Sequence, residues 1–419
     1  MNKQKNQRLL LYINALKTIL TIFSTTFFTS FILNLSPDNI LSKGCLNVAI
    51  FYLSQYFFYI LVYFVISKFL NKLNRVRSFQ IGIIVNGLLL ILIILFKENI
   101  SKLIFLAGLL IGCSDAFYYA NYLVLKSDTV KYTNINNFNI KTSVVTNVIN
   151  IVVPIILGFL IDISSFTYIS NYIVFIVLIQ LVLSAFLKPN LQIQKFRIKE
   201  FLKIIKEKEV YNKIKYTYWN AIFAGFKATY KTLIIILTIY AFNTNLSLGF
   251  LTSAFSIITT LLLLIFKKFE NTKNMNRLLI YLLISITPII FAIIFVFFES
   301  HWSLVLLNLF LTIAIQFSEY HSNCERDTII KNLRLKEFIP EHQFMVELYM
   351  CICRIFSYLL FILVSLTYSS ILFKILLMLM LLMNPIKFLF MNKQSVVRKE
   401  LEISFRSTTE HHIETDSTT

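Results

Sequence analysis

Twelve apolar runs, each long enough to cross a lipid bilayer, follow one another along this chain of 419 residues. A bilayer core takes about 20 mostly apolar residues per helix. Ile, Leu and Phe dominate the runs without strict alternation, which favours helices over the strands of a membrane barrel. The runs lie at 9–34, 44–67, 78–96, 103–125, 143–163, 168–187, 218–242, 247–266, 277–298, 302–322, 343–367 and 369–391.

Composition agrees with this pattern, because 57% of the residues are hydrophobic and only 15% are charged. Soluble domains carry about a quarter charged residues. Too few polar residues are therefore present to cover a water-soluble globule, and the high hydrophobicity also excludes a disordered chain. The sequence predicts an all-α integral membrane protein with twelve transmembrane helices in two six-helix bundles.

The cations indicate which way the helices cross the membrane. Of the 40 Lys and Arg residues, 32 lie in segments that alternate spans would place on one side, and three (Lys43, Lys97 and Lys102) lie on the other. Because cytoplasmic loops are enriched in Lys and Arg, both termini are predicted to be cytoplasmic. We expect the plasma membrane as the location.

The net charge of +19 could suggest a nucleic-acid binder, but the cations occupy short loops between spans rather than one face or tail. No nucleic-acid partner is therefore expected. The sequence has no Gly-rich phosphate loop and no metalloprotease or hydrolase motif. Its cysteines show no metal-ligand or disulfide spacing. We expect neither an enzyme nor a cofactor or metal, and direct use of ATP is not expected.

Four segments follow from the runs: an N-terminal bundle at 1–187, a basic linker at 188–217, a C-terminal bundle at 218–391 and a disordered cytoplasmic tail at 392–419. The linker holds nine cations and three acids. Two interpretations of it stay open: a solvated connection, or an amphipathic helix lying on anionic lipid with Ile198, Phe201, Ile204 and Ile205 on one side.

Six plus six spans around a basic linker resemble the major facilitator superfamily, whose two halves are related by an axis along the membrane normal. The loop after span two supports the resemblance. The family pattern there reads Gly-x-x-x-Asp-Arg/Lys-x-Gly-Arg, and this chain has Lys72, Arg75 and Arg77 at the basic positions. Ser67, Asn71 and Asn74 replace Gly, Asp and Gly, so the role of the acid in locking this conformational loop does not carry over. An ordinary positive loop is the alternative.

Two further patterns bear on the resemblance. Exporters of the family carry Gly-Pro-x-x-Gly-Gly in span five, and this chain keeps Pro154 and the final Gly158, which favours export slightly. A simple proline kink is the alternative.

The halves also resemble each other weakly, as repeats do. Lys17-Thr18 in span one corresponds to Lys231-Thr232 in span seven, and Ser114-Asp115 in span four to Ser318-Glu319 in span ten.

Several charges fall where lipid is expected, and each costs at least about 2.5–3.5 kcal/mol there unless it finds a partner or water. The resemblance implies that spans one, four, seven and ten line a central cavity, and Lys17, Asp115, Lys231 and Glu319 lie one on each. We expect them to form two Lys–acid pairs, one per half, that bind substrate or protons. Static pairs that hold helices in register are the alternative.

Other candidates accompany these four. Lys227 lies one helical turn before Lys231, and Arg354 shares a face with Glu347 in span eleven, where a structural role is expected. Tyr118 and Tyr119 stand beside Asp115 and could hold a lipophilic cation by cation–π contact, although packing explains them equally well.

The sequence therefore predicts a secondary active transporter, monomeric, proton-coupled through Asp115 and Glu319, with a small molecule or ion as substrate and the lipid bilayer as its environment. A lipid-linked saccharide flippase, which also suits a positive cavity and an anionic substrate, is the main alternative. A flippase would not group spans one, four, seven and ten. Another polytopic membrane protein, such as a scaffold, is a third possibility.

Overall fold

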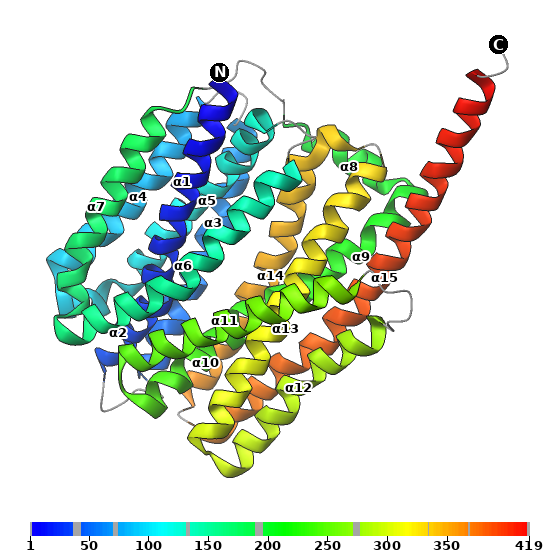
Figure 1. The fold of residues 1–419 in the computed structure, drawn as a ribbon. Coiled ribbons are helices and arrows are strands. Elements are labelled where there is room, and N and C mark those ends of the chain that lie inside the picture. The colour runs from blue at the N-terminus through cyan, green and yellow to red at the C-terminus, as the bar shows by residue number, and fades with distance from the viewer. Residues whose placement is uncertain are drawn as a thin grey trace.

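The computed structural model describes residues 2–36, 43–69, 74–130, 135–188, 196–270, 277–333, 335–367 and 369–416, and these residues form helices joined by short connections. Figure 1 shows the helices of the first half (blue to green-cyan) beside those of the second half (green to red). Both termini lie at the same end of the bundle, as an even number of crossings requires. We call this the inner end, following the charge pattern, and the opposite one the outer end.

The first half contains six spans. Span one is irregular, because two α-helices flank a π-helical stretch at Phe23–Phe27. The helices are α1 (Asn2–Ile22), α2 (Phe28–Asn34), α3 (Cys45–Phe69), α4 (Arg75–Phe96), α5 (Ile104–Thr129), α6 (Ile135–Ile163) and α7 (Phe166–Ala185).

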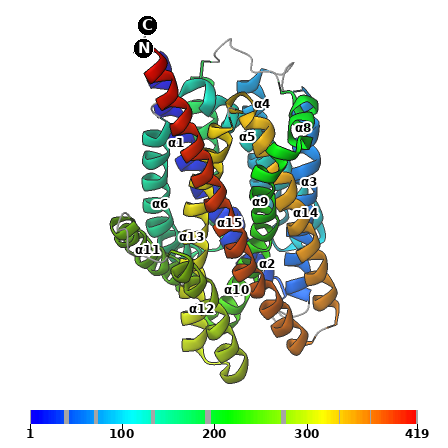
Figure 2. The same cartoon turned by 90° about the vertical axis from the view of Figure 1, so that its right-hand side faces the viewer.

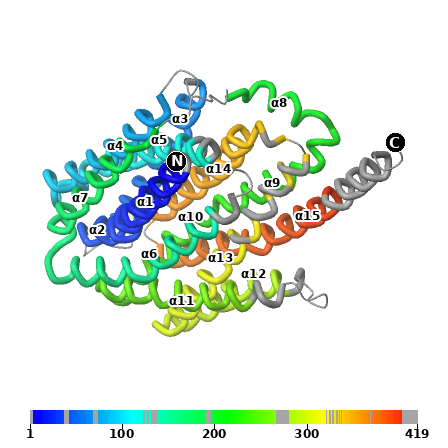
Figure 3. The backbone as a smooth tube through the Cα atoms, turned by 45° about the horizontal axis from the view of Figure 1, so that its top comes forward, coloured from blue at the N-terminus to red at the C-terminus, as the bar shows by residue number. Residues whose placement is uncertain are grey.

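The second half also contains six spans, preceded by a short helix. Span seven breaks at Phe226 into two helices, and Figure 3 shows the two halves side by side from nearer the inner end. The helices are α8 (Ile198–Lys206), α9 (Lys208–Gly225), α10 (Lys227–Phe242), α11 (Asn245–Glu270), α12 (Arg277–Phe298), α13 (His301–Asn332), α14 (Ile339–Leu366) and α15 (Ser370–Asp416).

Eleven helical stretches among the described residues are long and apolar enough to cross a membrane. One of them, Arg75–Tyr122, contains two spans, α4 and α5, which are joined by a 3-10 turn at Lys97–Leu103. The expected all-α membrane fold with twelve spans is thus confirmed. Large apolar side chains such as Phe297, Phe298 and Leu264 are exposed, as a lipid-facing surface requires.

The linker contains an amphipathic helix, but its apolar face packs on protein instead of lipid. On α8, Phe201 is fully buried and its ring stacks on Phe338. Before α8, the backbone N–H of Arg197 donates to Glu341 at 2.5 Å, and its guanidinium forms an ion pair with Glu337. The linker is therefore fastened to the second half, and the helix that leads into span seven begins at Lys208, within the predicted linker.

The C-terminal segment also differs from the expected disordered tail. Helix α15 continues past the span to Asp416, and Figure 2 shows it running beyond the bundle at the inner end. Val397 and Leu401, one turn apart, are buried with Ile329 of α13. This apolar contact stabilises the helix beyond the span, where composition alone indicated a disordered chain.

The two halves touch most extensively along two helix pairs. Helices α3 and α14 pack through aromatic rings, with Tyr52 stacked on Tyr358 nearer the outer end and Tyr63 against Phe344 nearer the inner end. Helices α6 and α11 approach so closely near their outer ends that a Cβ on Gly249 would lie 2.2 Å from the carbonyl oxygen of Pro154. Asp162 then accepts hydrogen bonds from the backbone N–H groups of Asn245 and Leu246, at the start of α11.

We predict that Gly249→Ala lowers the free energy of unfolding by about 1–3 kcal/mol, because overpacking a close backbone contact forces the helices apart. Gly87→Ala is the matched control, since a Cβ there meets only a methyl group of Val177 at 3.3 Å. This control should be neutral or stabilising, because alanine favours the helix. Unfolding in mixed micelles measures both, and equal effects of the two variants would contradict the proposed contact.

Candidate functional site

A cavity of about 290 Å³ lies between the two halves. Its wall comes from α1 with the π-helical stretch, α5 and α6 on one side, and from α10, α11 and α13 on the other. Spans one, four, seven and ten therefore all contribute to it, as the family resemblance implied. The charged residues in its wall are Lys17, Lys227, Lys231 and Glu319.

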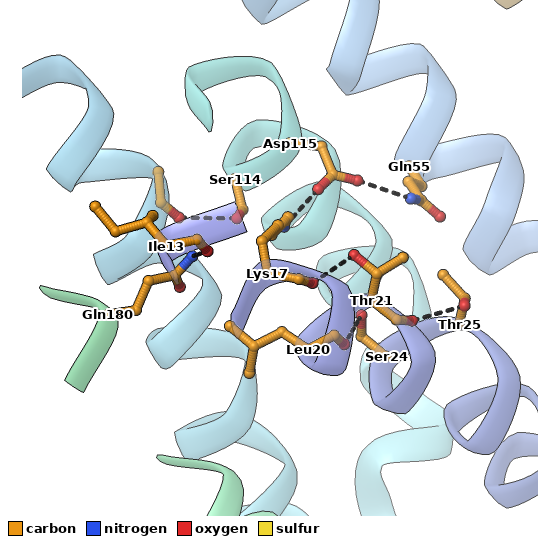
Figure 4. A network of polar contacts seen from close by, with 11 residues as sticks. Ile13, Lys17, Leu20, Thr21, Ser24, Thr25, Gln55, Ser114, Asp115 and Gln180 are labelled. Atoms are coloured by element: carbon orange, nitrogen blue, oxygen red, sulfur yellow. Dashed lines mark hydrogen bonds and ion pairs between the residues drawn. The ribbon is translucent and has the colours of Figure 1, made fainter. Parts of the chain in front are cut away.

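Lys17 and Asp115 form the pair expected in the first half (Figure 4). The Lys17 ammonium donates to Asp115 Oδ1 at 2.8 Å, and Gln55 Nε2 donates to the other carboxylate oxygen at 3.2 Å. The side chains are 5% and 17% exposed. The ammonium also lies 5.3 Å from the centre of the Tyr118 ring. Both charges are thus compensated within the protein.

Glu319 pairs with Lys227 in the second half, and not with Lys231 as expected. Helix α10 begins at Lys227, so this residue lies one turn nearer the inner end than Lys231. Helix α13 runs from the outer to the inner end and carries Glu319 beyond its midpoint, which places the carboxylate level with Lys227. This pair is more open than the first, with 28% and 38% of the side chains exposed.

Lys231 is left without a countercharge, since no carboxylate of the described part of the chain forms an ion pair with it. Its side chain is exposed and contributes to the cavity wall. Lys387 of α15 is almost fully buried and donates to Ser318 Oγ at 2.7 Å, directly beside Glu319. The second half therefore concentrates positive charge around its single cavity carboxylate.

Arg354 and Glu347 do approach each other, at 3.8 Å, but they lie outside the cavity wall. The Arg354 guanidinium stacks over the Tyr56 ring of α3 at 4.9 Å. It therefore contacts both halves along the α3–α14 contact.

The two tyrosines beside Asp115 differ in position. Tyr118 is 1% exposed and packs on Phe79 and under Lys17, whereas Tyr119 contributes to the cavity wall. Pro154 also contributes to the wall, and Gly158 packs against Asn245 at the outer end.

The conformational loop after span two is described only in part, because Lys72 lies outside the described residues. Asn74, which replaces a family glycine, caps α4 by accepting from the backbone N–H groups of Val76 and Arg77 at 3.1 and 3.3 Å. Arg75 is buried, whereas Arg77 is exposed.

Hydroxyl groups in the cavity wall were missed by the sequence reasoning. In span one, Thr18, Thr21 and Thr25 each donate to the carbonyl four residues earlier, and Figure 4 shows Thr21 and Thr25 doing so along one helix. The run of Ser and Thr at 24–26 is a sequence signal for this face, and it coincides with the π-helical stretch. Such irregularities occur frequently at functional sites.

Among the described residues, no three His, Cys, Asp or Glu side chains come together. The chemistry available in this cavity is ionic and hydrogen-bonding.

We predict that Asp115→Asn lowers the free energy of unfolding by about 3 kcal/mol, because it leaves the buried Lys17 ammonium without a countercharge. The double variant Lys17→Gln with Asp115→Asn should recover most of this loss. Glu299→Gln is the control. Glu299 pairs with Lys374 at the outer end and is 62% exposed, so removing this ion pair should lower the free energy of unfolding by less than about 1 kcal/mol. Equal effects of Asp115→Asn and Glu299→Gln in micelle unfolding would contradict this assignment.

Comparison with known proteins agrees with this architecture. The profile of the Major Facilitator Superfamily matches residues 15–321, which is most of the chain and includes both charge pairs. No curated protein matches the chain. Family members are secondary transporters that move small molecules across the membrane. This match shows that the chain belongs to the major facilitator superfamily, and the twelve spans of the chain and the cavity between its two halves agree with that family.

Proposed function

We propose that this protein is a proton-coupled secondary transporter that carries a small solute through the central cavity by alternating access. The observation that carries the proposal is the ion pair between Lys227 and Glu319 in the cavity wall. It is the partly exposed pair of the two, so water and solute can reach it when one side of the cavity opens.

Glu319 is the better candidate of the two carboxylates for the transported proton. A proton on Glu319 removes the countercharge of Lys227 and changes the charge of the cavity by one unit. A charged solute then binds with an affinity that depends on whether Glu319 is protonated. By linkage, the bound solute changes the proton affinity of Glu319 by the same factor. Asp115 accepts two hydrogen bonds and is largely buried, so its contacts hold α1 to α5 and leave it less accessible from the cavity than Glu319.

The flippase alternative is less well supported. It would not bring spans one, four, seven and ten to one cavity, whereas α1, α5, α10 and α13 all line the cavity here. Export remains the direction that the half motif in span five favours. Pro154 and Gly158 also have a structural use in the α6–α11 contact, so that motif has a second explanation.

The transport experiment uses proteoliposomes, a panel of labelled small solutes and an imposed pH gradient. We expect the wild type to accumulate at least one solute, and Glu319→Gln to lose accumulation at least tenfold while it keeps solute exchange without a gradient. Exchange requires binding and alternation but no net proton movement. Testing both gradient directions decides between uptake and export.

Asp115→Asn and Glu337→Gln separate the roles of the other carboxylates. Glu337 is exposed and pairs with Arg197 outside the cavity, so its variant should transport normally. Accumulation that survives in Glu319→Gln would contradict proton coupling through Glu319. A wild type that moves no panel member would contradict a small-solute carrier and favour the flippase.

A further inference from the structure

We propose that the transported solute is a small hydroxylated organic anion, whose carboxylate is bound by the Lys231 ammonium. This inference rests on the proposed function and adds the chemical class of its substrate. It starts from the balance of charges in the cavity wall.

Three ammonium groups and one carboxylate line the cavity. Lys17 is neutralised by Asp115, and Lys227 by Glu319, each through a direct ion pair. Lys231 remains, exposed to the cavity and without an ion pair in the described part of the chain. An ammonium inside the membrane needs a countercharge or water. A single carboxylate on the solute supplies that countercharge.

A cationic solute fits this cavity less well. Its natural partners would be carboxylates and aromatic faces. Glu319, the carboxylate of the wall, already binds Lys227, and Asp115, outside the wall, binds Lys17. The rings of Tyr119 and Phe255 belong to the wall, but neither supplies a countercharge. Lys387 adds a further positive charge beside Glu319 through its hydrogen bond with Ser318. A cation entering here would meet uncompensated charge of its own sign.

The hydroxyl groups of the wall indicate what the rest of the solute carries. Thr18, Thr21, Thr252, Ser256 and Thr312 each donate their hydroxyl proton to a carbonyl of their own helix. A hydroxyl has one proton and two lone pairs, so these groups can only accept further hydrogen bonds. A solute with several O–H groups matches such a surface.

The size of the cavity sets the scale of the solute. Ligand pockets usually enclose about 300–1,000 Å³, and the volume of about 290 Å³ lies at the lower limit. A six-carbon hydroxy acid is of this size class, and a lipid-linked saccharide is not.

The charged groups near Glu319 also couple the binding of the anion to the binding of a proton. The charged groups nearest Glu319 among the described residues are Lys227 and Lys231 on α10 and Lys387 from α15. On α14, Arg354 and Glu347 also act on Lys227, but they pair with each other and add no net charge. A proton on Glu319 makes the cavity more positive, so proton and anion strengthen each other's binding. An inward proton gradient would then drive uptake of the anion, the opposite of the export that span five favours.

The first test measures the charge of the cavity without any substrate. Ser256→Cys places a thiol in the cavity wall, and its labelling rates with sulfonatoethyl and trimethylammonioethyl methanethiosulfonate are compared in detergent. Rates of the parent protein, which has five cysteines, are subtracted. We expect the anionic reagent to be favoured, and Lys231→Gln to lower the anion-to-cation ratio about fivefold, as one nearby charge would.

Lys102→Gln is the matched control, because Lys102 is exposed at the outer end, away from the cavity wall. It should leave the labelling ratio unchanged. A cavity thiol that prefers the cationic reagent, or a ratio that Lys231→Gln does not change, would overturn the proposal.

The second test uses probes of equal length that differ in charge: gluconate, sorbitol and glucamine, with hexanoate as the anion without hydroxyl groups. We expect gluconate to raise the thermal unfolding temperature more than the other three. Lys231→Gln should abolish the shift and Lys231→Arg should keep part of it. Stabilisation by glucamine or sorbitol instead, or none by gluconate, would overturn the hydroxylated anion. Gradient-driven flux of a neutral or cationic solute would also overturn the hydroxylated anion, but it would still support the proposed transporter function.

Discussion

The cost of a charge within the membrane is the constraint on which the arrangement of this protein depends. Each ionisable residue of the spans must meet an opposite charge, a polar partner or water. Lys17 and Asp115 meet each other, and Arg354 reaches both Glu347 and the Tyr56 ring. Lys231 meets only the cavity. The paired groups hold helices together. Lys231, which has no ion pair in the described part of the chain, lies where we propose that a solute binds.

The two halves use the same plan with different results. In the first half, the Lys–acid pair joins α1 to α5 and is buried under tyrosine and glutamine. In the second half, the break at Phe226 starts a new helix at Lys227 and places two lysines one turn apart, opposite one carboxylate. Lys231 lies beside the more exposed pair, Lys227 and Glu319. The charge of the cavity can therefore change more readily in the second half than in the first.

Sequence reasoning reached the fold because hydrophobic run length and loop charge are local properties of the chain. It also placed Lys17, Lys231 and Glu319 at one cavity, since span number and the family resemblance assign them to lining helices. Asp115 was expected in the cavity wall as well, but it lies outside the wall and is held by Lys17 and Gln55. Sequence reasoning chose the wrong partner for Glu319, because spacing within one helix does not give its height relative to another. The buried contact of Val397 and Leu401 with Ile329 was invisible for the same reason.

The sequence by itself determined the class of protein, the number of spans and the residues that have no place in lipid. Each of these follows from the transfer of side chains from water to hydrocarbon, which depends on the residue and its near neighbours. Only the tertiary structure decided which charges neutralise each other, that α8 packs on protein, and that Lys231 is left facing the cavity. Those outcomes depend on the relative height and rotation of helices far apart in the chain, which packing between helices sets.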